Sequence, residues 1–302
     1  MTDIKVCYVV VASGWDRHAQ MAWLSAYSVR LQDPGVRIVI VLEAPADAAD
    51  ALVRRFSGVA DDVLLRQVDE TNPVKKSRLH RLALRDYVDG DLLYVDSDTL
   101  AVRPVSPVSA YREEVGAVMD FNHPADSTWC PPELEGTFLR LGWAYPLPRF
   151  FNAGVIFMRD TARVRAFCAE WAVRFRTPSD APEHTWDQST FNSALFASGA
   201  SYVVLPHDYN AMIVKRGYRF RTARLLHFFG SAEEQRGTLM EQMLKHLGEH
   251  DEFDVRTYRR CIREGHPWGP NPEPWQLYRS RNYVRAASRK LGKLVSSVAG
   301  RH

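Results

Sequence analysis

The chain has 302 residues, of which 46% are hydrophobic, so it is long enough to bury the core of one large α/β domain. Its formal net charge of +3 is unevenly distributed: the segment from Arg279 onward holds seven basic and no acidic residues, which leaves the preceding body at −4. An acidic body argues against general nucleic-acid binding, because that function requires a basic face on the folded domain.

Cysteine usage and hydropathy exclude further classes. The four cysteines are scattered without a C-x-x-C pair, which predicts neither a zinc site nor a disulfide framework. No charged-then-apolar leader opens the chain, and no apolar run approaches the roughly 20 residues of a membrane-spanning helix. We therefore expect a cytoplasmic protein, either free or peripheral on the inner face of the membrane.

The first third of the chain alternates apolar runs with amphipathic segments. We predict strands over 5–12, 36–42, 63–68 and 91–95 and helices over 18–30, 47–56 and 75–87. This order predicts a parallel sheet with right-handed connections and a ligand crevice along the carboxyl ends of its strands. The first strand-to-helix turn has no G-x-G-x-x-G, so we expect no dinucleotide cradle there.

The strand predicted to end at residue 95 runs directly into Asp96, Ser97 and Asp98. Positions i and i+2 of an extended chain share one face, and two carboxylates that close together repel unless a cation lies between them. The spacing therefore indicates Mg²⁺ or Mn²⁺ holding a phosphate-bearing substrate. The alternatives are a turn cap and an Asp-nucleophile phosphatase, although Thr99 stands one position too early for the second. A calcium loop is excluded because its acid-x-acid-x-acid-Gly spacing is absent.

The middle of the chain adds polar residues at further strand ends. A strand over 115–119 ends in Asp120, and a strand over 150–158 contains Phe-Asn-Ala-Gly, whose small residues let a ligand approach the backbone. Between them, residues 121–149 hold five prolines and several aromatic residues, which predicts either a surface loop or a substrate-binding loop for sugar rings.

The later part of the chain supplies two more candidates. We predict helices over 163–175 and from about Asp187 and a strand over 202–205. Asp187 is either functional or only a first-turn acid favoured by the helix dipole. His227 follows two leucines and is either a structural histidine or the third ligand that a two-carboxylate site needs for a Mn²⁺-like ion.

Taken in order, these pieces resemble the retaining glycosyltransferases of family 8, which have the GT-A nucleotide-sugar fold. The resemblance covers about residues 5–231. The matching pieces are Val-Ala-Ser at 11–13, Arg78-Leu79-His80, Leu-Tyr-Val-Asp-Ser-Asp-Thr-Leu at 93–100, Gly116 to Asp120, Phe-Asn-Ala-Gly-Val at 151–155, Asp187-Gln188 with Asn192, Leu205-Pro206 with Asn210, and Leu-His-Phe-Phe-Gly at 226–230.

The resemblance implies a role for each matching residue. Asp96, Asp98 and His227 would coordinate Mn²⁺, or Mg²⁺, on the diphosphate of a UDP-sugar. The cofactor-binding set would also contain Val11, Ala12, Ser13, Arg78, Arg81, Ser97, Asn152, Ala153 and Gly230. The sugar pocket would be lined by Asp120, Asn152, Ala153, Asp187 and Gln188, with Asp120, Asp187 and Gln188 as the catalytic residues.

The chain departs from the family pattern in two places. Gly14 and Trp15 follow Ser13 where the family usually has Asp and then Tyr for the base. The family's Lys-Pro-Trp after His-x-x-Gly is replaced by Ser-Ala-Glu-Glu at 231–234. Candidate replacements for the phosphate-binding lysine are Arg236, Lys215 and Arg216, and the residues His-Pro-Trp at 266–268 resemble a displaced copy of the motif.

The sequence thus predicts an α/β protein with the GT-A fold, a mixed and mainly parallel sheet flanked by helices. We expect a catalytic domain over 1–250 and a helical extension over 251–302. The predicted activity is metal-dependent hexosyl transfer from a UDP-sugar to a glycan, glycolipid or other hydroxyl acceptor with retention of configuration. Same-face attack is favoured over a double displacement through Asp187. The alternatives are a non-catalytic sugar-nucleotide or glycan-binding protein and the Asp-nucleophile phosphatase.

The C-terminal segment 279–302 has apolar residues at near-helical spacing with Arg and Lys between them. This pattern predicts a basic amphipathic helix for an anionic membrane surface. A terminal helix that packs on the body fits the same pattern.

Overall fold

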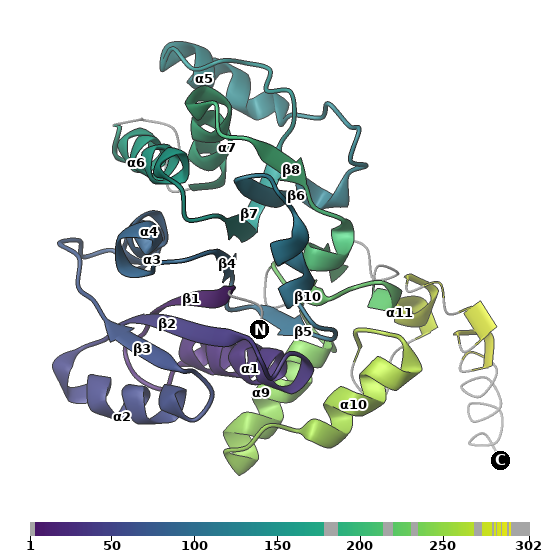
Figure 1. Cartoon of the computed structure of the whole chain (residues 1–302). Coiled ribbons are helices and arrows are strands. Elements are labelled where there is room, and N and C mark those ends of the chain that lie inside the picture. The colour runs from purple at the N-terminus through teal and green to yellow at the C-terminus, as the bar shows by residue number, and fades with distance from the viewer. Residues whose placement is uncertain are drawn as a thin grey trace, which may run out of the picture.

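The computed structural model describes residues 4–177, 187–213, 220–230, 235–268, 274–279, 281, 283, 284, 286–288 and 290. A seven-stranded sheet in the order β3-β2-β1-β4-β7-β6-β8 forms its centre (Figure 1). The strands are β1 (Lys5–Val11), β2 (Arg37–Glu43), β3 (Asp62–Leu65), β4 (Leu92–Val95), β6 (Val115–Met119), β7 (Phe151–Met158) and β8 (Tyr202–Val204).

Helices cover both faces of this sheet (Figure 1). Alternate residues of β1 contact opposite layers: Tyr8 packs in the core shared with α1 and α2, and Val9 in the core shared with α3, α6 and α7. The helices are α1 (Arg17–Gln32), α2 (Ala46–Ser57), α3 (Pro73–Leu82), α4 (Leu84–Tyr87), α5 (Glu135–Arg140), α6 (Ala162–Arg176), α7 (Asp187–Ser198), α9 (Leu239–His250), α10 (Val255–Glu264) and α11 (Pro274–Arg279).

One strand runs against the others and decides where the site residues meet. β3, β2, β1 and β4 are parallel, as predicted, but β7 pairs antiparallel with both β4 and β6. The connection from β6 to β7 contains no helix that crosses the sheet, so the chain returns in the opposite direction. The amino end of β7 therefore lies at the same edge as the carboxyl ends of β4 and β6.

A second sheet of three short strands was not predicted. It has the order β5-β10-β9, with β5 (Thr99–Ala101) antiparallel to β10 (Leu225–His227) and β10 parallel to β9 (Ala211–Met212). His227 is opposite Thr99 in this ladder. The small sheet therefore brings a segment from late in the chain against the residues that follow β4.

Two predicted segments are corrected by the structure. The helix predicted over 75–87 is two helices, because the backbone leaves helical geometry at Ala83 (φ −90°, ψ 6°). The segment 121–149, predicted to be irregular, contains α5, and its residues Leu134, Phe138 and Leu147 form a small core with the adjacent Phe150.

The helices after residue 238 extend a core that begins in the first half of the chain. Leu24 of α1, Leu100 of β5, Met243 of α9 and Tyr258 of α10 are buried together. The division into domains after residue 250 stays a prediction. Within the part of the chain that the structure describes, every helix is too short or too polar to cross a lipid bilayer.

Candidate metal and nucleotide-sugar site

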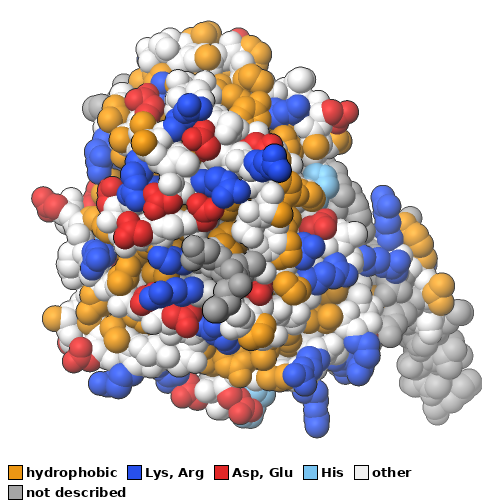
Figure 2. Space-filling model, in the orientation of Figure 1, with side chains coloured by type: hydrophobic (Ala, Val, Ile, Leu, Met, Phe, Trp, Pro, Cys, Tyr) orange, Lys and Arg blue, Asp and Glu red, His pale blue; other side chains and the backbone are white. Residues whose placement is uncertain are grey.

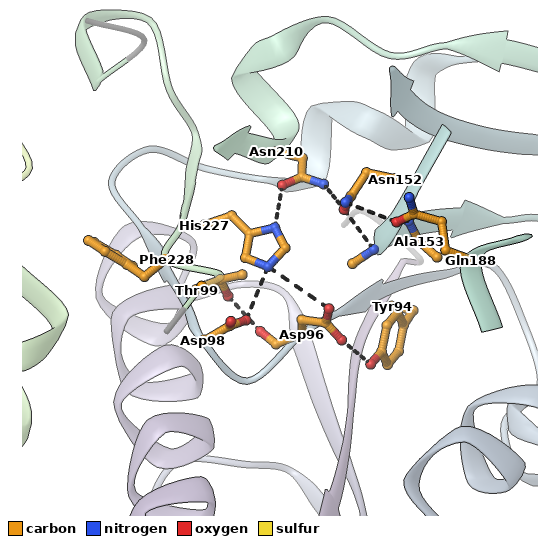
Figure 3. Close-up of polar contacts among 12 residues, drawn as sticks. Tyr94, Asp96, Asp98, Thr99, Asn152, Ala153, Gln188, Asn210, His227 and Phe228 are labelled. Atoms are coloured by element: carbon orange, nitrogen blue, oxygen red, sulfur yellow. Dashed lines mark hydrogen bonds and ion pairs between the residues drawn. The ribbon is translucent and has the colours of Figure 1, made fainter. Parts of the chain in front are cut away.

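Asp96, Asp98 and His227 come together at the carboxyl edge of the sheet (Figure 3). One ligand atom from each lies within 4.8 Å of the others, and no other group of three potential metal ligands occurs among the described residues. The Nε2 atom of His227 is 3.1 Å from Asp98 Oδ1 and 4.0 Å from Asp96 Oδ2. The structure therefore brings together the three side chains that the sequence assigns to a metal, and their role as metal ligands stays a prediction.

Backbone hydrogen bonds fix the two segments that carry these ligands. The amide of Asp96, directly after β4, donates to the carbonyl of Gly154 in β7 at 2.8 Å. The amide of Phe228, directly after His227, donates to the carbonyl of Asp98 at 2.9 Å. Both aspartates are therefore positioned by neighbouring strands and not by a free turn. Ser97, between them, is buried.

A chain of amide side chains fixes the tautomer of His227 (Figure 3). The backbone N–H of Gly154 can only donate, so the atom of Asn152 that it meets at 2.9 Å is the acceptor Oδ1. Asn210 Nδ2 donates to the same Oδ1 at 2.8 Å, which turns Asn210 Oδ1 toward His227 Nδ1 at 2.8 Å. His227 therefore carries a proton on Nδ1, and Nε2 is the atom that faces the two carboxylates.

Gly154 keeps the space between the ligands open. A Cβ atom at this position would lie 2.6 Å from His227 Cε1, 2.7 Å from Asp96 Oδ2 and 2.9 Å from Asn152 Oδ1. No side chain larger than hydrogen fits there without displacing a ligand. Two carboxylates, one imidazole nitrogen and this small cradle suit a divalent ion such as Mn²⁺ or Mg²⁺.

Burial and charge act against each other on the pKa values of the ligands. For Asp98, burial alone would raise the pKa, but the adjacent His227 outweighs it and the pKa is lowered. For His227, burial alone would lower the pKa, but Asp98 outweighs it and the pKa is raised. Each of the two groups thus favours the charged form of the other, as in an ion pair.

Arg81 joins the metal group to Asp187. Its guanidinium donates to Asp96 Oδ1 at 2.7 Å and to the carbonyl of Ala153 at 3.0 Å, and it forms an ion pair with Asp187 Oδ2 at 2.8 Å. The other carboxylate oxygen of Asp187 is 3.1 Å from Arg78 Nε. Asp187 is therefore held between two arginines at the start of α7, and Arg78 keeps about 30% of its side chain exposed.

The remaining predicted sugar-pocket residues share one hydrogen-bond network. Asn152 Nδ2 donates to Asp120 Oδ1 and to Gln188 Oε1, each at 3.1 Å, and the amide of Ala153 donates to Gln188 Oε1 at 3.2 Å. Burial raises the pKa of Asp120, although its hydrogen bond from Asn152 works against this effect. The structure thus brings Asp120, Asn152, Ala153 and Gln188 together beside the metal group.

Val11, Ala12 and Ser13, predicted to hold the nucleotide, line an open hollow of about 600 Å³ at the ends of β1 and β2. Ser13 is turned toward Asp16, which accepts from its amide at 2.9 Å and its hydroxyl at 3.2 Å. Trp15 packs edge-on against the rings of Trp23 and Phe56.

The same hollow is lined by Glu43 and Lys76, which the sequence analysis did not identify. A sequence pattern could have identified Glu43, because it is a carboxylate at the end of a buried strand, as Asp96 and Asp120 are. The predicted strand stopped at residue 42, one residue before it.

The candidates for the missing lysine are only partly located. Lys215, Arg216 and the segment 231–234 lie outside the described residues. Arg236 is exposed, and Gly230 has a φ of 130° at the surface. Arg17 is held near this turn, because it donates to Gln235 Oε1 at 2.9 Å while Gln235 Nε2 donates to the carbonyls of Phe228 and Gly230 at 2.7 and 3.2 Å.

The segment 266–268 does not restore the family's lysine motif. His266 stands where the motif has lysine, and it is buried against Glu264 and the carbonyl of Trp268. Trp268 pairs with Thr238 and donates from its indole to the carbonyl of Gln276 at 2.8 Å. These residues therefore stabilise the C-terminal helices.

No protein-family model matches the sequence, and none of the curated protein sequences matches it. Solved structures do. The bifunctional glycosyltransferase WbbM superposes with a TM-score of 0.56 at 15% identity, over 81% of this chain and 51% of its own. GlyE of Streptococcus pneumoniae TIGR4 superposes with a TM-score of 0.56 at 13% identity, and the match covers 90% of this chain and 66% of GlyE. An active-site mutant of LgtC superposes with a TM-score of 0.50 at 16% identity, and the match covers 85% of this chain and 99% of LgtC.

The chain has the GT-A fold. The predicted fold class and the resemblance to family 8 are therefore confirmed at the level of the fold. The chain spans about half of WbbM and 66% of GlyE, so both of these proteins contain further parts.

Proposed function

We propose that the protein is a metal-dependent retaining glycosyltransferase that moves a hexose from a UDP-sugar to a hydroxyl of a glycan or glycolipid. One observation carries the proposal. The amide chain from Gly154 through Asn152 and Asn210 turns His227 Nε2 toward two carboxylates, in a space that only a glycine leaves open. This is a preorganised cation site at the edge of a nucleotide-sugar fold.

Asp96, Asp98 and His227 would hold Mn²⁺ or Mg²⁺, which as a Lewis acid stabilises the charge on the leaving diphosphate. The chain then has to place the sugar. Asp120, Asn152 and Gln188 form a buried polar wall that suits sugar hydroxyls, because each side chain is already oriented by the others.

Arg81 and Arg78 support a same-face reaction over a double displacement. Both oxygens of Asp187 are paired with guanidinium groups, so this carboxylate is poorly suited to attack an anomeric carbon. In our proposal Asp187 holds the two arginines. Arg81 in turn holds Asp96, and Gln188 positions the sugar and stabilises positive charge on its ring.

An aromatic surface next to the metal group suits a sugar acceptor. Phe121 follows Asp120, is 37% exposed and has a left-handed backbone (φ 48°). Its ring lies 6.0 Å from Trp129 and 6.1 Å from Phe229, and Phe229 lies 5.3 Å from His227. Since aromatic faces contact the C–H groups of pyranose rings, we propose that this surface receives the acceptor.

The C-terminal segment supports our proposal of a membrane-proximal location. Tyr283 is 53% and Val284 84% exposed, and Figure 2 shows Lys and Arg side chains gathered over the C-terminal helices. The rest of the predicted amphipathic pattern, residues 291–302, lies outside the described residues. We propose binding to anionic lipid through 279–302. Flotation with phosphatidylserine vesicles should require this segment, and equal flotation without it would contradict the proposal.

The function is tested by incubating the protein with a panel of nucleotide sugars and Mn²⁺ and following free sugar and nucleotide by mass spectrometry. We expect hydrolysis or transfer from a UDP-sugar that stops with EDTA and falls by about 1,000-fold or more in Asp98→Asn. Asp89→Asn, an exposed carboxylate before β4, is the matched control.

Three results would contradict the proposal. Turnover that persists in Asp98→Asn with EDTA would remove the metal from the mechanism. Nucleotide-sugar binding without any turnover would indicate a non-catalytic binding protein. A trapped aspartyl-phosphate at Asp96 would indicate a phosphatase.

A further inference from the structure

A buried charged group forms part of the hollow beside β1 and is not used by the mechanism above. Glu43, at the end of β2, is only 3% exposed, and His80 of α3 is fully buried. Glu43 Oε2 is 2.5 Å from His80 Nε2 and accepts from the amide of Val68 at 3.3 Å, and Glu43 Oε1 pairs with the ammonium of Lys76. Glu43 and Lys76 both line the hollow.

The two side chains offer opposite hydrogen-bonding properties. Burial alone would raise the pKa of Glu43, but Lys76 and His80 outweigh it and the pKa is lowered, so the carboxylate accepts hydrogen bonds at neutral pH. Lys76 can only donate. It carries three N–H groups on a flexible stem, and 24% of its side chain is exposed.

The position of the hollow relates it to the metal group. Glu43 is paired with Val11 across the β1–β2 ladder, and its carbonyl accepts from the amide of Ala12 at 3.0 Å. The hollow is therefore at the same sheet edge as the metal group. Open α/β sheets bind ligands along the carboxyl ends of their strands, so a nucleotide whose diphosphate lies at Asp96 and Asp98 can extend along this edge to the hollow. Trp15 and Ser13, the nearest residues of the first turn, are engaged in packing and in binding Asp16.

We propose that Lys76 and Glu43 select the base of the donor nucleotide and that they favour a base with a carbonyl beside a ring N–H, which means uracil or guanine. The mobile ammonium of Lys76 donates to the exocyclic oxygen, which projects beyond the ring. The fixed carboxylate of Glu43 accepts from the ring N–H. Cytosine and adenine present a ring nitrogen lone pair to this carboxylate and are repelled.

This inference rests on the proposed function only in requiring that a nucleotide binds. It is tested by calorimetric titration of the full chain with UDP, GDP, CDP and ADP in the presence of Mn²⁺. We expect UDP or GDP, or both, to bind at least about tenfold more tightly than CDP and ADP, as one charge-assisted hydrogen bond provides.

Two variants and a matched control locate the preference. Lys76→Met and Glu43→Gln should each weaken UDP binding by about tenfold and reduce the preference over CDP, while binding of inorganic diphosphate with Mn²⁺ stays unchanged. Lys75→Met is the control, because Lys75 precedes Lys76 on α3 but lines a different hollow with Asp69 and Glu70. Lys76 is partly exposed, so its variant remains informative if Glu43→Gln fails to fold.

The outcomes separate this inference from the function. Equal binding of all four nucleotides, tighter binding of CDP or ADP, or a preference that survives both variants would overturn the base assignment and leave the transferase proposal standing. If none of the four nucleotides binds, both fail.

Discussion

The metal group and the base hollow lie at one edge of the same sheet but are built differently. At the metal group, hydrogen bonds of Asn152 and Asn210 hold His227, and a Cβ atom at Gly154 would lie within 3 Å of His227, Asp96 and Asn152. The base hollow has a volume of about 600 Å³, and Lys76 on its wall is partly exposed. The difference follows from the ligand. Charge that develops on a diphosphate is stabilised best by fixed groups, whereas a neutral base needs space and one or two directional bonds.

A substitution at Gly154 should disrupt the metal group and leave the base hollow intact. In Gly154→Ala the new methyl group would lie within 2.7 Å of atoms of both His227 and Asp96, so one ligand must move. We expect Mn²⁺ affinity to fall by at least about 100-fold, measured by calorimetry, while metal-free binding of uridine is unchanged. Gly136→Ala is the control, since nothing lies within 4 Å of a Cβ there. Equal Mn²⁺ affinity in both variants would show that metal binding does not depend on the space that Gly154 leaves between the ligands.

Lower pH should weaken Mn²⁺ binding at the metal group before it weakens nucleoside binding at the base hollow. The pKa of His227 is raised, so the His227–Asp98 pair stabilises the metal-free fold most below the ordinary histidine pKa, and this contribution is lost as pH rises through the raised value. A proton on Nε2 competes with the metal, so Mn²⁺ affinity should fall by up to about tenfold per pH unit below that raised value.

The pKa of Glu43 is shifted in the opposite direction from that of His227. Its pKa is lowered, so the carboxylate stays ionised until pH falls through that lowered value. Uridine binding without metal should therefore persist at a pH where Mn²⁺ binding is already weak. Parallel calorimetric titrations with uridine and with Mn²⁺ between pH 8 and about pH 5 measure both. Loss of both at the same pH would contradict the separate assignment of the two regions.

The smallest predicted effect lies outside both regions. Phe121→Leu should raise the KM for a glycan acceptor by about three- to tenfold, because an aliphatic side chain loses the aromatic contact with the sugar ring. Mn²⁺ affinity and hydrolysis of the donor without acceptor should not change. Leu139→Ala on α5, which is 59% exposed, is the control. A changed donor KM in Phe121→Leu would place the donor sugar, and not the acceptor, on this surface.

The sequence predicts those site residues whose pattern lies within a single strand, and it predicts less well those whose place depends on contacts between distant segments. Asp96 and Asp98 were found from the pattern of one strand, because a buried run that ends in charge depends only on neighbouring residues. For His227 the residues left two interpretations open, a structural histidine or a third metal ligand, and the resemblance to a family favoured the second. Its place beside Asp98 depends on strands of two and three residues, whose periodicity is too short to recognise.

Sequence reasoning named Asn210 and Arg81 without their roles, and it missed Glu43 and Lys76, because all four act through partners far along the chain. Asn210 matters because it orients His227, and Arg81 because it joins Asp96 to Asp187. Glu43 and Lys76 looked like ordinary charged residues at the ends of a strand and on a helix. The antiparallel direction of β7, which brings Asn152 to the metal edge, was likewise not indicated by any local pattern.

The central claim is that Asp96, Asp98 and His227 hold one divalent ion on the diphosphate of a nucleotide sugar. Titration with Mn²⁺, followed by electron paramagnetic resonance with and without UDP, tests it most directly. We predict one bound Mn²⁺ per chain, a higher Mn²⁺ affinity when UDP is present because the two ligands share contacts, and loss of this site in Asp98→Asn. Equal Mn²⁺ binding by the wild type and Asp98→Asn, or no effect of UDP on Mn²⁺ affinity, would contradict the account.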